Sequence, residues 1–480
     1  MKGLLFICLL LTVLFVNAQC PQGGVQLRTQ SEVDSFIIKW PDCKNFIGSI
    51  GVGIPIVFSG GSQSSCPIES DITNLRGLRN IETINRDLII SCVPDLGSLR
   101  GLDNLMEVQR LFEIRHMPGL VDFTGLERFK RQTGNFFVYS PNLASVKGLD
   151  SVYYILNLSI ENFRHIEFES FSQLEEVFRF GLLGSSHFHG LPKLKKIGNT
   201  FGTVNNDSIV EFKLLNQLEQ NELYSLNFAS CSKLKKIDIP ISFNKIQNWR
   251  LLDNSSLPNL HDFRVVRTSE DITLEKLPLL EDLTGLENIT GYLREMRITE
   301  MSGLKSLDGI GFSEFSWFSI KNNPELVDIF AMDKMKLGPL IYSNEEQLRI
   351  EGNPKLSNCV NELICGLAQI SPQRLFLSGN GPGCSSITEI LEACALVSTD
   401  DDTDTPQASI SLYPNPAHDW VMIRGAADLY SVRLLDMMGR QLRHSSSDRI
   451  DLTDLDAGMY IIIVGDQNGV LHTEKLSVVK

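Results

Sequence analysis

The sequence predicts a mainly β protein in which a long β-solenoid precedes a small antiparallel β-sandwich. Three observations predict it. A short apolar alternation that ends in a turn recurs through the middle of the chain, and glycines recur beside it about every 23 residues, which is typical of stacked coils. The last part of the chain loses this period and shows strand-like runs separated by Asp, Asn and Gly. Cysteines gather near both ends of the repetitive part, where we expect disulfide bonds to close a core that lacks packing neighbours.

The composition is that of a soluble globular protein with two or three domains. The 480 residues are 42% hydrophobic and 21% charged, and the net charge is −14. Because proteins that bind nucleic acid need a basic surface, we do not expect this acidic chain to bind nucleic acid. The same charge argues against docking on an anionic membrane surface.

Residues 1–18 have the pattern of a secretory signal peptide. Lys2 supplies a positive start, residues 4–16 form an apolar run, and residues 16–18 offer small side chains for a cleavage site. A lipoprotein signal is not expected, because Gln19 rather than a small residue precedes Cys20. The apolar run is short for a membrane helix, and no other apolar stretch approaches about 18 residues, so we expect no membrane span.

Residues 19–65 are predicted to cap the first coil of the solenoid. The spacing from Thr29 to Glu32 is that of a capping box, and Val33 and Phe36 follow it with helical periodicity. We therefore expect a short helix that begins near Thr29.

Export to an oxidising compartment would leave nine cysteines once Cys8 departs with the signal peptide. No CxxC pair occurs, so a zinc site or a thioredoxin-type motif is not expected. We expect a Cys20–Cys43 bridge to hold the predicted helix over the first coil. The C-terminal cluster consists of Cys359, Cys365, Cys384 and Cys394. These four can pair in three ways, which stay open. Cys231 is isolated among apolar neighbours, and we interpret it as a free, inert core thiol.

The repeat has the form Φ-x-Φ-x-x-x-(Pro/Ser)-x-Leu, where Φ is an apolar residue. Its clearest copies begin at Phe112, Ile272, Met296, Phe318 and Leu348. The two apolar residues face the same side of a strand, and a proline in the turn cannot donate to a β-ladder. One coil cannot bury its own interior but stacked coils can, so the repeat predicts a solenoid over residues 66–395. An array of amphipathic helices fits the two-residue alternation less well.

An apolar-x-Gly-apolar step follows the clear copies and gives the period. Its glycines are Gly77, Gly101, Gly125, Gly148, Gly285 and Gly309. The first four are 24, 24 and 23 residues apart, and the last two are 24 residues apart. Degenerate copies fill the gap between Gly148 and Gly285, so the spacing predicts about ten coil steps from Gly77 to Gly309.

These coils resemble the receptor L-domain, a leucine-rich β-solenoid of growth-factor receptor ectodomains and bacterial surface proteins. The resemblance covers residues 66–395, and the strand ends at Asn353 and Asn380 are also similar to those of ordinary leucine-rich repeats. It implies an L-domain-like solenoid with stapled ends, because bacterial proteins of this kind often finish in a cap of four cysteines, as residues 359–394 do here.

Residues 396–407 are predicted to be an acidic linker. The stretch from Ser398 to Pro406 holds four aspartates and no apolar side chain, so it cannot pack a core. A calcium site is the alternative, but the stretch lacks the glycine and the final glutamate of an EF-hand loop. We therefore favour a solvated linker.

Residues 408–480 contain strand-like runs between turn residues, which predict a small antiparallel β-sandwich. Its distinctive residues are Tyr413, Pro414, Asn415, Pro416, Gly439, Arg440, Gly458, Tyr460 and Lys475. This pattern resembles the type A C-terminal sorting domain of the type IX secretion system. The resemblance implies export through the outer membrane, with the type IX machinery and its surface peptidase as partners, followed by anchoring at the cell surface or release.

Motifs for catalysis and metal binding are sparse. No GxSxG, HExxH, P-loop or GxGxxG motif stands in a supporting context, and we expect no cofactor. His187 and His189 share one strand face but lack a third ligand nearby, so a metal site is not expected. Asp262, Asp282 and Asp328 each follow a repeat leucine by two positions. They form either an acidic row that faces a substrate or the caps of turns, and we favour the caps.

We therefore expect a secreted, surface-displayed protein that binds or adheres to an unknown protein or glycan, without enzyme activity. The alternatives are a secreted polysaccharide-active β-helix enzyme and a structural component of the cell surface. A cleft with an acidic row beside Lys or Arg would favour the enzyme. A continuous, varied and uncharged face would favour binding.

Overall fold

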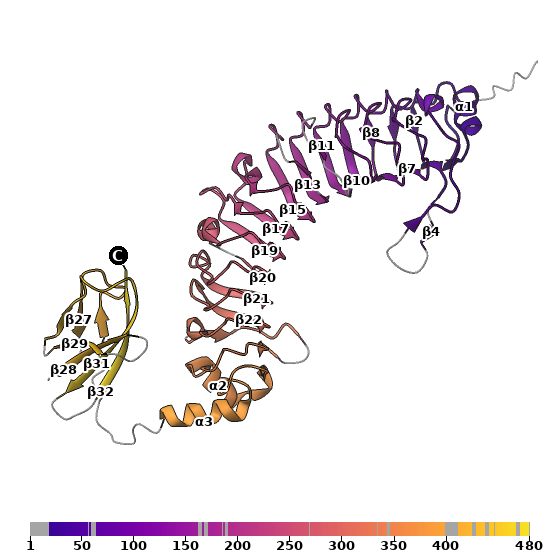
Figure 1. Ribbon diagram of the computed structural model, residues 1–480. Coiled ribbons are helices and arrows are strands. Elements are labelled where there is room, and N and C mark those ends of the chain that lie inside the picture. The colour runs from indigo at the N-terminus through magenta and orange to yellow at the C-terminus, as the bar shows by residue number, and fades with distance from the viewer. Residues whose placement is uncertain are drawn as a thin grey trace, which may run out of the picture. The chain divides into compact units, whose positions relative to one another are not determined.

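The computed structural model describes residues 19–55, 57–58, 64–161, 166–167, 171–184, 186–187, 191–267, 269–333, 335–342, 346–398, 411–424, 429–436, 441–445, 447–466 and 471–479. The chain divides into two compact units, Met1–Leu396 and Val397–Lys480. The first is built on a parallel sheet of 19 strands and the second on antiparallel sheets (Figure 1). The mainly β fold class is thereby confirmed.

Several predicted features lie outside the described residues. They are the signal peptide of residues 1–18, most of the linker of residues 396–407, and the motif residues Gly439 and Arg440. Within the described part of the chain, no helix is long and apolar enough to cross a membrane.

The first helix, α1 (Gln30–Lys39), begins where the capping box predicts. The backbone N–H of Glu32 donates to the Thr29 hydroxyl at 3.3 Å, and the Glu32 carboxylate accepts from the Thr29 backbone at 3.1 Å. Each group satisfies an N–H that the first helical turn leaves unpaired. The buried side chains of Val33 and Phe36 then attach the helix to the core of the solenoid.

The main ladder of the solenoid joins each strand in parallel to the strand of the next coil. In chain order its strands are β1 (Val25–Leu27), β3 (Ile50–Gly53), β7 (Asp87–Ser91), β9 (Leu111–Arg115), β10 (Arg131–Tyr139), β11 (Tyr154–Glu161), β13 (Glu176–Leu183), β15 (Lys196–Val204), β17 (Glu222–Ala229), β19 (Lys245–Leu252), β20 (Asp271–Glu275), β21 (Gly291–Thr299), β22 (Phe312–Lys321), β24 (Leu348–Glu351) and β25 (Leu375–Ser378). Since β1 and β3 belong to this ladder, residues 19–65 contribute coils of their own as well as α1.

Short strands extend the sheet beside the main ladder. The strands β2 (Asn45–Phe46), β6 (Thr83–Ile84) and β8 (Glu107–Val108) pair in sequence and reach the start of β10, while β23 (Lys336–Leu337) pairs with β22. Separate two-stranded pairs are β4 (Val57–Phe58) with β5 (Ser64–Ser65), β12 (Ile166–Glu167) with β14 (Ser186–His187), and β16 (Glu211–Phe212) with β18 (Lys236–Ile237). Short 3₁₀ turns are η1 (Arg76–Leu78), η2 (Leu214–Gln217), η3 (His261–Val265), η4 (Phe330–Met332) and η5 (Pro372–Arg374).

The core of the solenoid is built from rows of apolar side chains that stack from coil to coil. One row contains Leu88, Phe112, Phe136, Leu158, Phe180, Phe201, Leu226, Trp249, Ile272, Met296, Phe318 and Leu348. All of them are buried, and the rings of Phe112 and Phe136 stack with their centres 4.8 Å apart. Each buried side chain of this size contributes about 1.5–3 kcal/mol of hydrophobic stabilisation.

A left-handed residue ends the main strand of many coils. Positive φ angles occur there at Cys92, His116, Asn205, Ser230, Asp253, Lys276, Glu300, Asn322, Gly352 and Gly379. The residue that follows turns inward, and in the last coils it is asparagine. Asn323 donates through Nδ2 to Oδ1 of Asn353 at 3.0 Å, and Asn353 donates in the same way to Asn380 at 3.0 Å. The strand therefore ends in a left-handed turn and a buried amide ladder, and not only in the proline of the repeat.

The glycines of the apolar-x-Gly-apolar step let neighbouring coils approach closely. Gly125 has a φ of 107°, and a Cβ placed on it would lie 2.2 Å from the carbonyl carbon of Leu99 in the preceding coil. Gly101 has a φ of 110° and the same relation to Leu75. Both the backbone conformation and the available space therefore require glycine.

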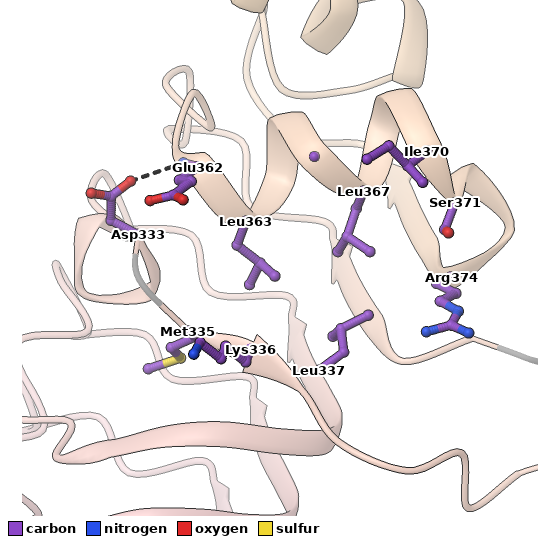
Figure 2. A pocket seen from close by; sticks show the side chains of 11 residues that line it. Asp333, Met335, Lys336, Leu337, Glu362, Leu363, Leu367, Ile370, Ser371 and Arg374 are labelled. Carbon is purple, nitrogen blue, oxygen red and sulfur yellow. Dashed lines mark hydrogen bonds between the residues drawn. The ribbon is translucent and has the colours of Figure 1, made fainter.

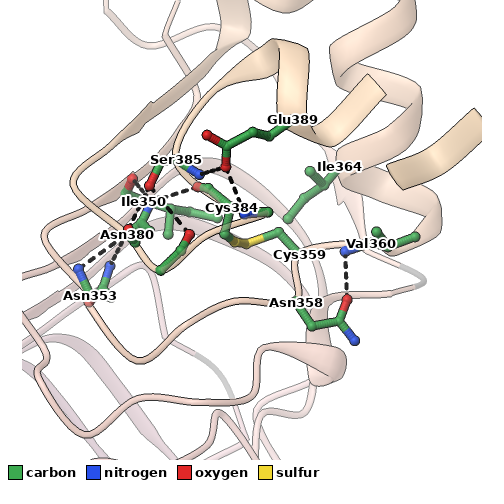
Figure 3. The surroundings of a disulfide bond; sticks show 12 residues. Ile350, Asn353, Asn358, Cys359, Val360, Ile364, Asn380, Cys384, Ser385 and Glu389 are labelled. Atoms are coloured by element: carbon green, nitrogen blue, oxygen red, sulfur yellow. Dashed lines mark hydrogen bonds between the residues drawn. A yellow bond between two sulfur atoms is a disulfide. The ribbon is translucent and has the colours of Figure 1, made fainter. Parts of the chain in front are cut away.

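Disulfide bonds close both ends of the solenoid, so the expectation of disulfides is confirmed. Cys20 pairs with Cys43, and Cys66 pairs with Cys92. At the C-terminal end, where α2 (Glu362–Ile370) and α3 (Ile387–Ser398) cover the last coils, the bonds are Cys359–Cys384 and Cys365–Cys394. Figure 3 shows Cys359–Cys384 near the asparagine ladder. Cys231 is buried and free.

The C-terminal unit has a three-stranded and a four-stranded antiparallel sheet. The first contains β26 (Ser411–Tyr413), β27 (Trp420–Arg424) and β30 (Arg449–Asp451). The second contains β29 (Gln441–Ser445), β28 (Leu429–Asp436), β31 (Gly458–Asp466) and β32 (Leu471–Val478). The unit has its own core, which includes Val421, Val432, Ile450, Ile462 and Leu476.

Candidate functional site

Alternate residues of the main strands point away from the core and form one exposed sheet face. One row of this face contains Phe137, Ser159, Gly181, Gly202, Asn227, Arg250 and Thr273, in register on neighbouring strands. The side chains are large at Phe137 and Arg250 and small or missing between them. The exposed face is therefore recessed between Phe137 and Arg250.

The hollow over β10–β17 has a volume of about 580 Å³. Asn135, Asn157, Asn199 and Asn227 give it carboxamide groups, and Phe137 and Tyr224 give it aromatic groups. Among the described residues that line it, Arg179 is the only charged one. The wall is therefore rich in groups that both donate and accept hydrogen bonds.

A second hollow of about 620 Å³ continues the first over β17–β21. Both are lined by Tyr224, Ser225 and Asn227, so together they form one channel across the strands, which we call the sheet-face groove. The side chain of Tyr224 is 49% exposed beside it. The second hollow adds Asn248, Arg250 and several ion-paired residues to the lining.

Gly181 and Gly202 form the floor of the sheet-face groove and deepen it, because they have no side chain. Neither position requires glycine for steric reasons. A Cβ placed on Gly181 would have its nearest neighbours at 3.7 Å, and one placed on Gly202 would have its nearest neighbour at 3.6 Å. Those are ordinary contact distances, and neither residue has a positive φ. In contrast to Gly125, the effect of these glycines is to leave space on the exposed face.

Hydrogen bonds hold the amide side chains of the groove in place. Nδ2 of Asn157 donates to Oδ1 of Asn135 at 2.7 Å. Nδ2 of Asn227 donates to the Ser225 hydroxyl at 3.1 Å, and Nδ2 of Asn248 donates to the Tyr224 carbonyl at 3.2 Å. These bonds orient the amides before any ligand arrives, which lowers the entropy cost of binding.

Ion pairs neutralise the carboxylates of the second hollow. Asp271 pairs with Arg294, and Glu295 pairs with Arg297, whose guanidinium lies 4.5 Å from the centre of the Trp317 ring. Burial raises the pKa of the Asp271 carboxyl above its ordinary value, and the charge of Arg294 opposes this rise. A carboxylate held by an arginine is a poor candidate for general acid–base work.

Two further hollows lie outside the sheet-face groove, and one of them is on the same exposed face at its N-terminal strands. One of about 480 Å³ lies between β23 and α2, where Leu337, Leu363 and Leu367 make it largely apolar (Figure 2). The other, of about 330 Å³, lies beside β1 and β3. Neither brings together an aromatic and amide lining of the kind found in the sheet-face groove.

The aspartates considered for an acidic row do not form one in a cleft. Asp282 accepts from the backbone N–H of Thr284 at 2.8 Å, and Asp328 accepts from that of Phe330 at 2.6 Å, so both cap turns. Asp262 lies in η3, where burial raises its pKa. Within the described ranges, no three His, Cys, Asp or Glu residues are grouped to hold a metal ion. The His187–His189 pair lies outside the residues whose side chains are described.

Asn415 of the predicted sorting motif joins the start of the C-terminal unit to its last strand, β32. Asn415 donates through Nδ2 to the Lys475 carbonyl at 2.8 Å, and its Oδ1 accepts from the backbone N–H of Ser477 at 2.9 Å. The Tyr460 hydroxyl donates to the Asp456 carbonyl at 2.8 Å. The other described residues of the sorting motif are Tyr413, Pro414 and Pro416, at the start of the unit, and Gly458, on β31.

Sequence reasoning expected a broad binding face but did not locate the sheet-face groove. The sequence contained a sign of it, because Ser159 and Gly181 each lie between two apolar residues of a main strand, and Gly202 lies between Phe201 and Thr203. An outward strand position that is small in three successive coils indicates a gap in the exposed face.

Comparison with known proteins identifies the C-terminal unit. Residues 411–479 match the family model of the secretion system C-terminal sorting domain. No curated protein matches the chain. The sorting domain indicates that the protein is exported by the type IX machinery and secreted to the cell surface or the extracellular space.

Proposed function

We propose that the exported protein is a binding or adhesion protein, not an enzyme, and that it holds its ligand in the sheet-face groove. The observation that carries this proposal is the continuous channel over β10–β21, whose floor is kept low by Gly181 and Gly202. Concave sites with a few oriented polar groups are the usual places for ligands. The resemblance of the coils to receptor L-domains supports the same function.

The polar groups of the groove support binding rather than catalysis. Hydrolysis of a polysaccharide would need two free carboxylates, one of them a proton donor. In the groove Asp271 and Glu295 are paired with arginines, and Glu275 lies 3.7 Å from the Lys276 ammonium. The amides of Asn135 and Asn157 can orient a ligand but have no proton to transfer at neutral pH.

The rigidity of the coils also supports a binding face. Each strand of the face is hydrogen-bonded to both neighbours, and disulfide bonds close the two ends. A preformed surface loses little conformational entropy when a ligand binds. Such a surface suits a protein that acts outside the cell.

The proposal can be tested by filling the groove. The full-length protein and its Gly202→Tyr variant would be applied to a panel of immobilised polysaccharides and extracellular matrix proteins. The tyrosine has room on the strand, since an added Cβ meets only ordinary contacts. Gly97→Tyr is the matched control, because Gly97 is exposed, has no positive φ and lies outside the groove.

We expect the wild-type protein and Gly97→Tyr to retain at least one probe that Gly202→Tyr loses. Retention of no probe, or equal retention by Gly202→Tyr, would reject the groove as the binding site. Release of soluble sugar from a retained polysaccharide would favour the enzyme instead.

A further inference from the structure

Several arginines in the groove and elsewhere along the coils form ion pairs with carboxylates. Nε of Arg110 lies 2.9 Å from Oδ1 of Asp87, and Nε of Arg349 lies 2.7 Å from Oε1 of Glu346. Arg115, Arg294 and Arg297 form ion pairs with Glu113, Asp271 and Glu295. Each of these five arginines therefore has an acidic partner.

Arg179 and Arg250 differ from these arginines. Both are exposed and line the groove, yet neither forms an ion pair with any residue in the described part of the chain. Arg179 donates through Nε to the amide oxygen of Asn199 at 3.3 Å, which orients its guanidinium. Its outer N–H groups, like those of Arg250, have no carboxylate within ion-pair distance among the described residues.

The positions of these two arginines fit a long ligand. Arg179 is on β13 and Arg250 is on β19, with β15 and β17 between them. Three strand spacings make about 14 Å across the sheet, and a shift of two residues adds about 7 Å along the strands. Gly202 and Asn227 form the open floor between them.

The charge of the lining also differs from that of the whole chain. Four arginines and three carboxylates line the groove, which leaves it with one net positive charge, whereas the chain carries −14. Guanidinium groups bind carboxylates and sulfates through two parallel hydrogen bonds. The guanidinium groups of Arg179 and Arg250 have no carboxylate partner in the ranges that the structure describes, although the protein is acidic. This indicates that the ligand supplies the anionic group that they bind.

We propose that the sheet-face groove binds an acidic polysaccharide, with carboxylate or sulfate groups of separate sugar residues on Arg179 and Arg250. This inference rests on the proposed binding function and names its ligand class. The sugar hydroxyls meet the amides of Asn135, Asn199 and Asn248, which can both donate and accept, and a sugar ring packs beside Tyr224. An acidic peptide fits less well, because the backbone groups of the strands are already used in the ladder.

The test uses polygalacturonate as the acidic probe and its fully methyl-esterified form as the neutral one. Binding of each to the full-length protein would be measured by affinity electrophoresis and biolayer interferometry. The variants are Arg179→Gln and Arg250→Gln, which remove the charge and keep hydrogen-bonding capacity. Arg100→Gln, at an exposed arginine outside the groove, is the control for net charge. Poly-glutamate is the peptide probe.

We expect polygalacturonate to bind, the methyl ester to bind at least about tenfold more weakly, and each groove variant to lose about tenfold in affinity. Arg100→Gln should bind like the wild type. Equal binding of the ester, stronger binding of poly-glutamate, or unchanged binding by both groove variants would overturn the inference. Loss of probe binding in Gly202→Tyr without loss in the arginine variants would reject only the acidic ligand, whereas no effect of any variant would reject the groove as well.

Discussion

The backbone N–H of Cys231 donates to the side-chain oxygen of Asn254 at 3.1 Å, one coil further along the chain. The sulfur of Cys231 in turn lies 4.0 Å from the Thr203 carbonyl and 3.5 Å from the Ala229 carbonyl. In the last coils an asparagine amide fills this place: Nδ2 of Asn353 reaches the equivalent carbonyls of the preceding coil and of its own coil at 3.1 and 3.2 Å. Cys231 therefore occupies a position of the amide ladder that asparagine fills in other coils. Its thiol is a weaker hydrogen-bond donor than an amide.

The first prediction concerns this position. Cys231→Asn should raise the free energy of unfolding by about 1 kcal/mol, because an amide replaces a weak thiol donor and gains an acceptor. Cys231→Val, which removes the donor, should be less stable than the wild type. Urea unfolding of the three proteins would measure the difference. A Cys231→Asn variant less stable than Cys231→Val would contradict the assignment.

The second prediction is a pH dependence at the same residue. Burial raises the pKa of the Cys231 thiol from 9.0 to about 11. The unfolded chain therefore loses this proton before the folded one does, and stability falls as the pH rises from about 9 to about 11, by about 1.4 kcal/mol per pH unit. Below pH 9 the thiol has no such effect. Comparing wild type with Cys231→Val between pH 8.5 and 10.5 isolates this loss, and parallel curves would argue against it.

The third prediction separates two kinds of glycine. Gly125→Ala should lower the free energy of unfolding by about 2 kcal/mol or more, since the residue has a φ of 107° and no room for a Cβ. Gly202→Ala should leave it unchanged or raise it by up to about 1 kcal/mol, because glycine weakens a strand interior. Thermal unfolding of both variants would show the contrast. Similar losses in the two would mean that Gly202 also has a structural role.

The coils could be predicted from local sequence because the residues that define each coil lie close together in the chain. Phe112 and Ile114 define the buried side of a strand by their spacing alone, and Gly125 marks the approach to the preceding coil. The period then follows from counting residues. The helix that begins at Thr29 was predictable for the same reason, since the residues that cap it are neighbours in the chain.

The groove and one disulfide depend on relations between distant residues. Ser159, Gly181 and Gly202 are 22 and 21 residues apart, which differs from the period of the clear copies, so their alignment depends on the strand register of these coils. The Cys66–Cys92 bond likewise spans 26 residues. In the C-terminal unit, β29 and β30 are short and mostly polar, so their sequences lack the apolar runs that indicate strands.

The fourth prediction is that reduction weakens the solenoid from its ends. The four disulfides close chain segments of 23 to 29 residues, and each contributes about 2–4 kcal/mol. Coils in the middle have neighbours on both sides and depend less on them. With reductant, hydrogen exchange should increase first in α2, α3, β1 and β3 and later in β15–β19. A uniform loss of protection along the solenoid would count against stapled ends.

The last prediction concerns export. Deleting residues 408–480 should leave the solenoid folded but keep it in the periplasm. The solenoid and the C-terminal unit have separate hydrophobic cores, so removing one exposes none of the apolar interior of the other. The predicted signal peptide accounts only for passage across the inner membrane, and the deleted part contains residues 411–479, which match the sorting domain. Fractionation of cells that express the two forms would locate each, and thermal unfolding would show that the truncated form is folded. If that folded form still reached the surface or the medium, the sorting role of the C-terminal unit would be wrong.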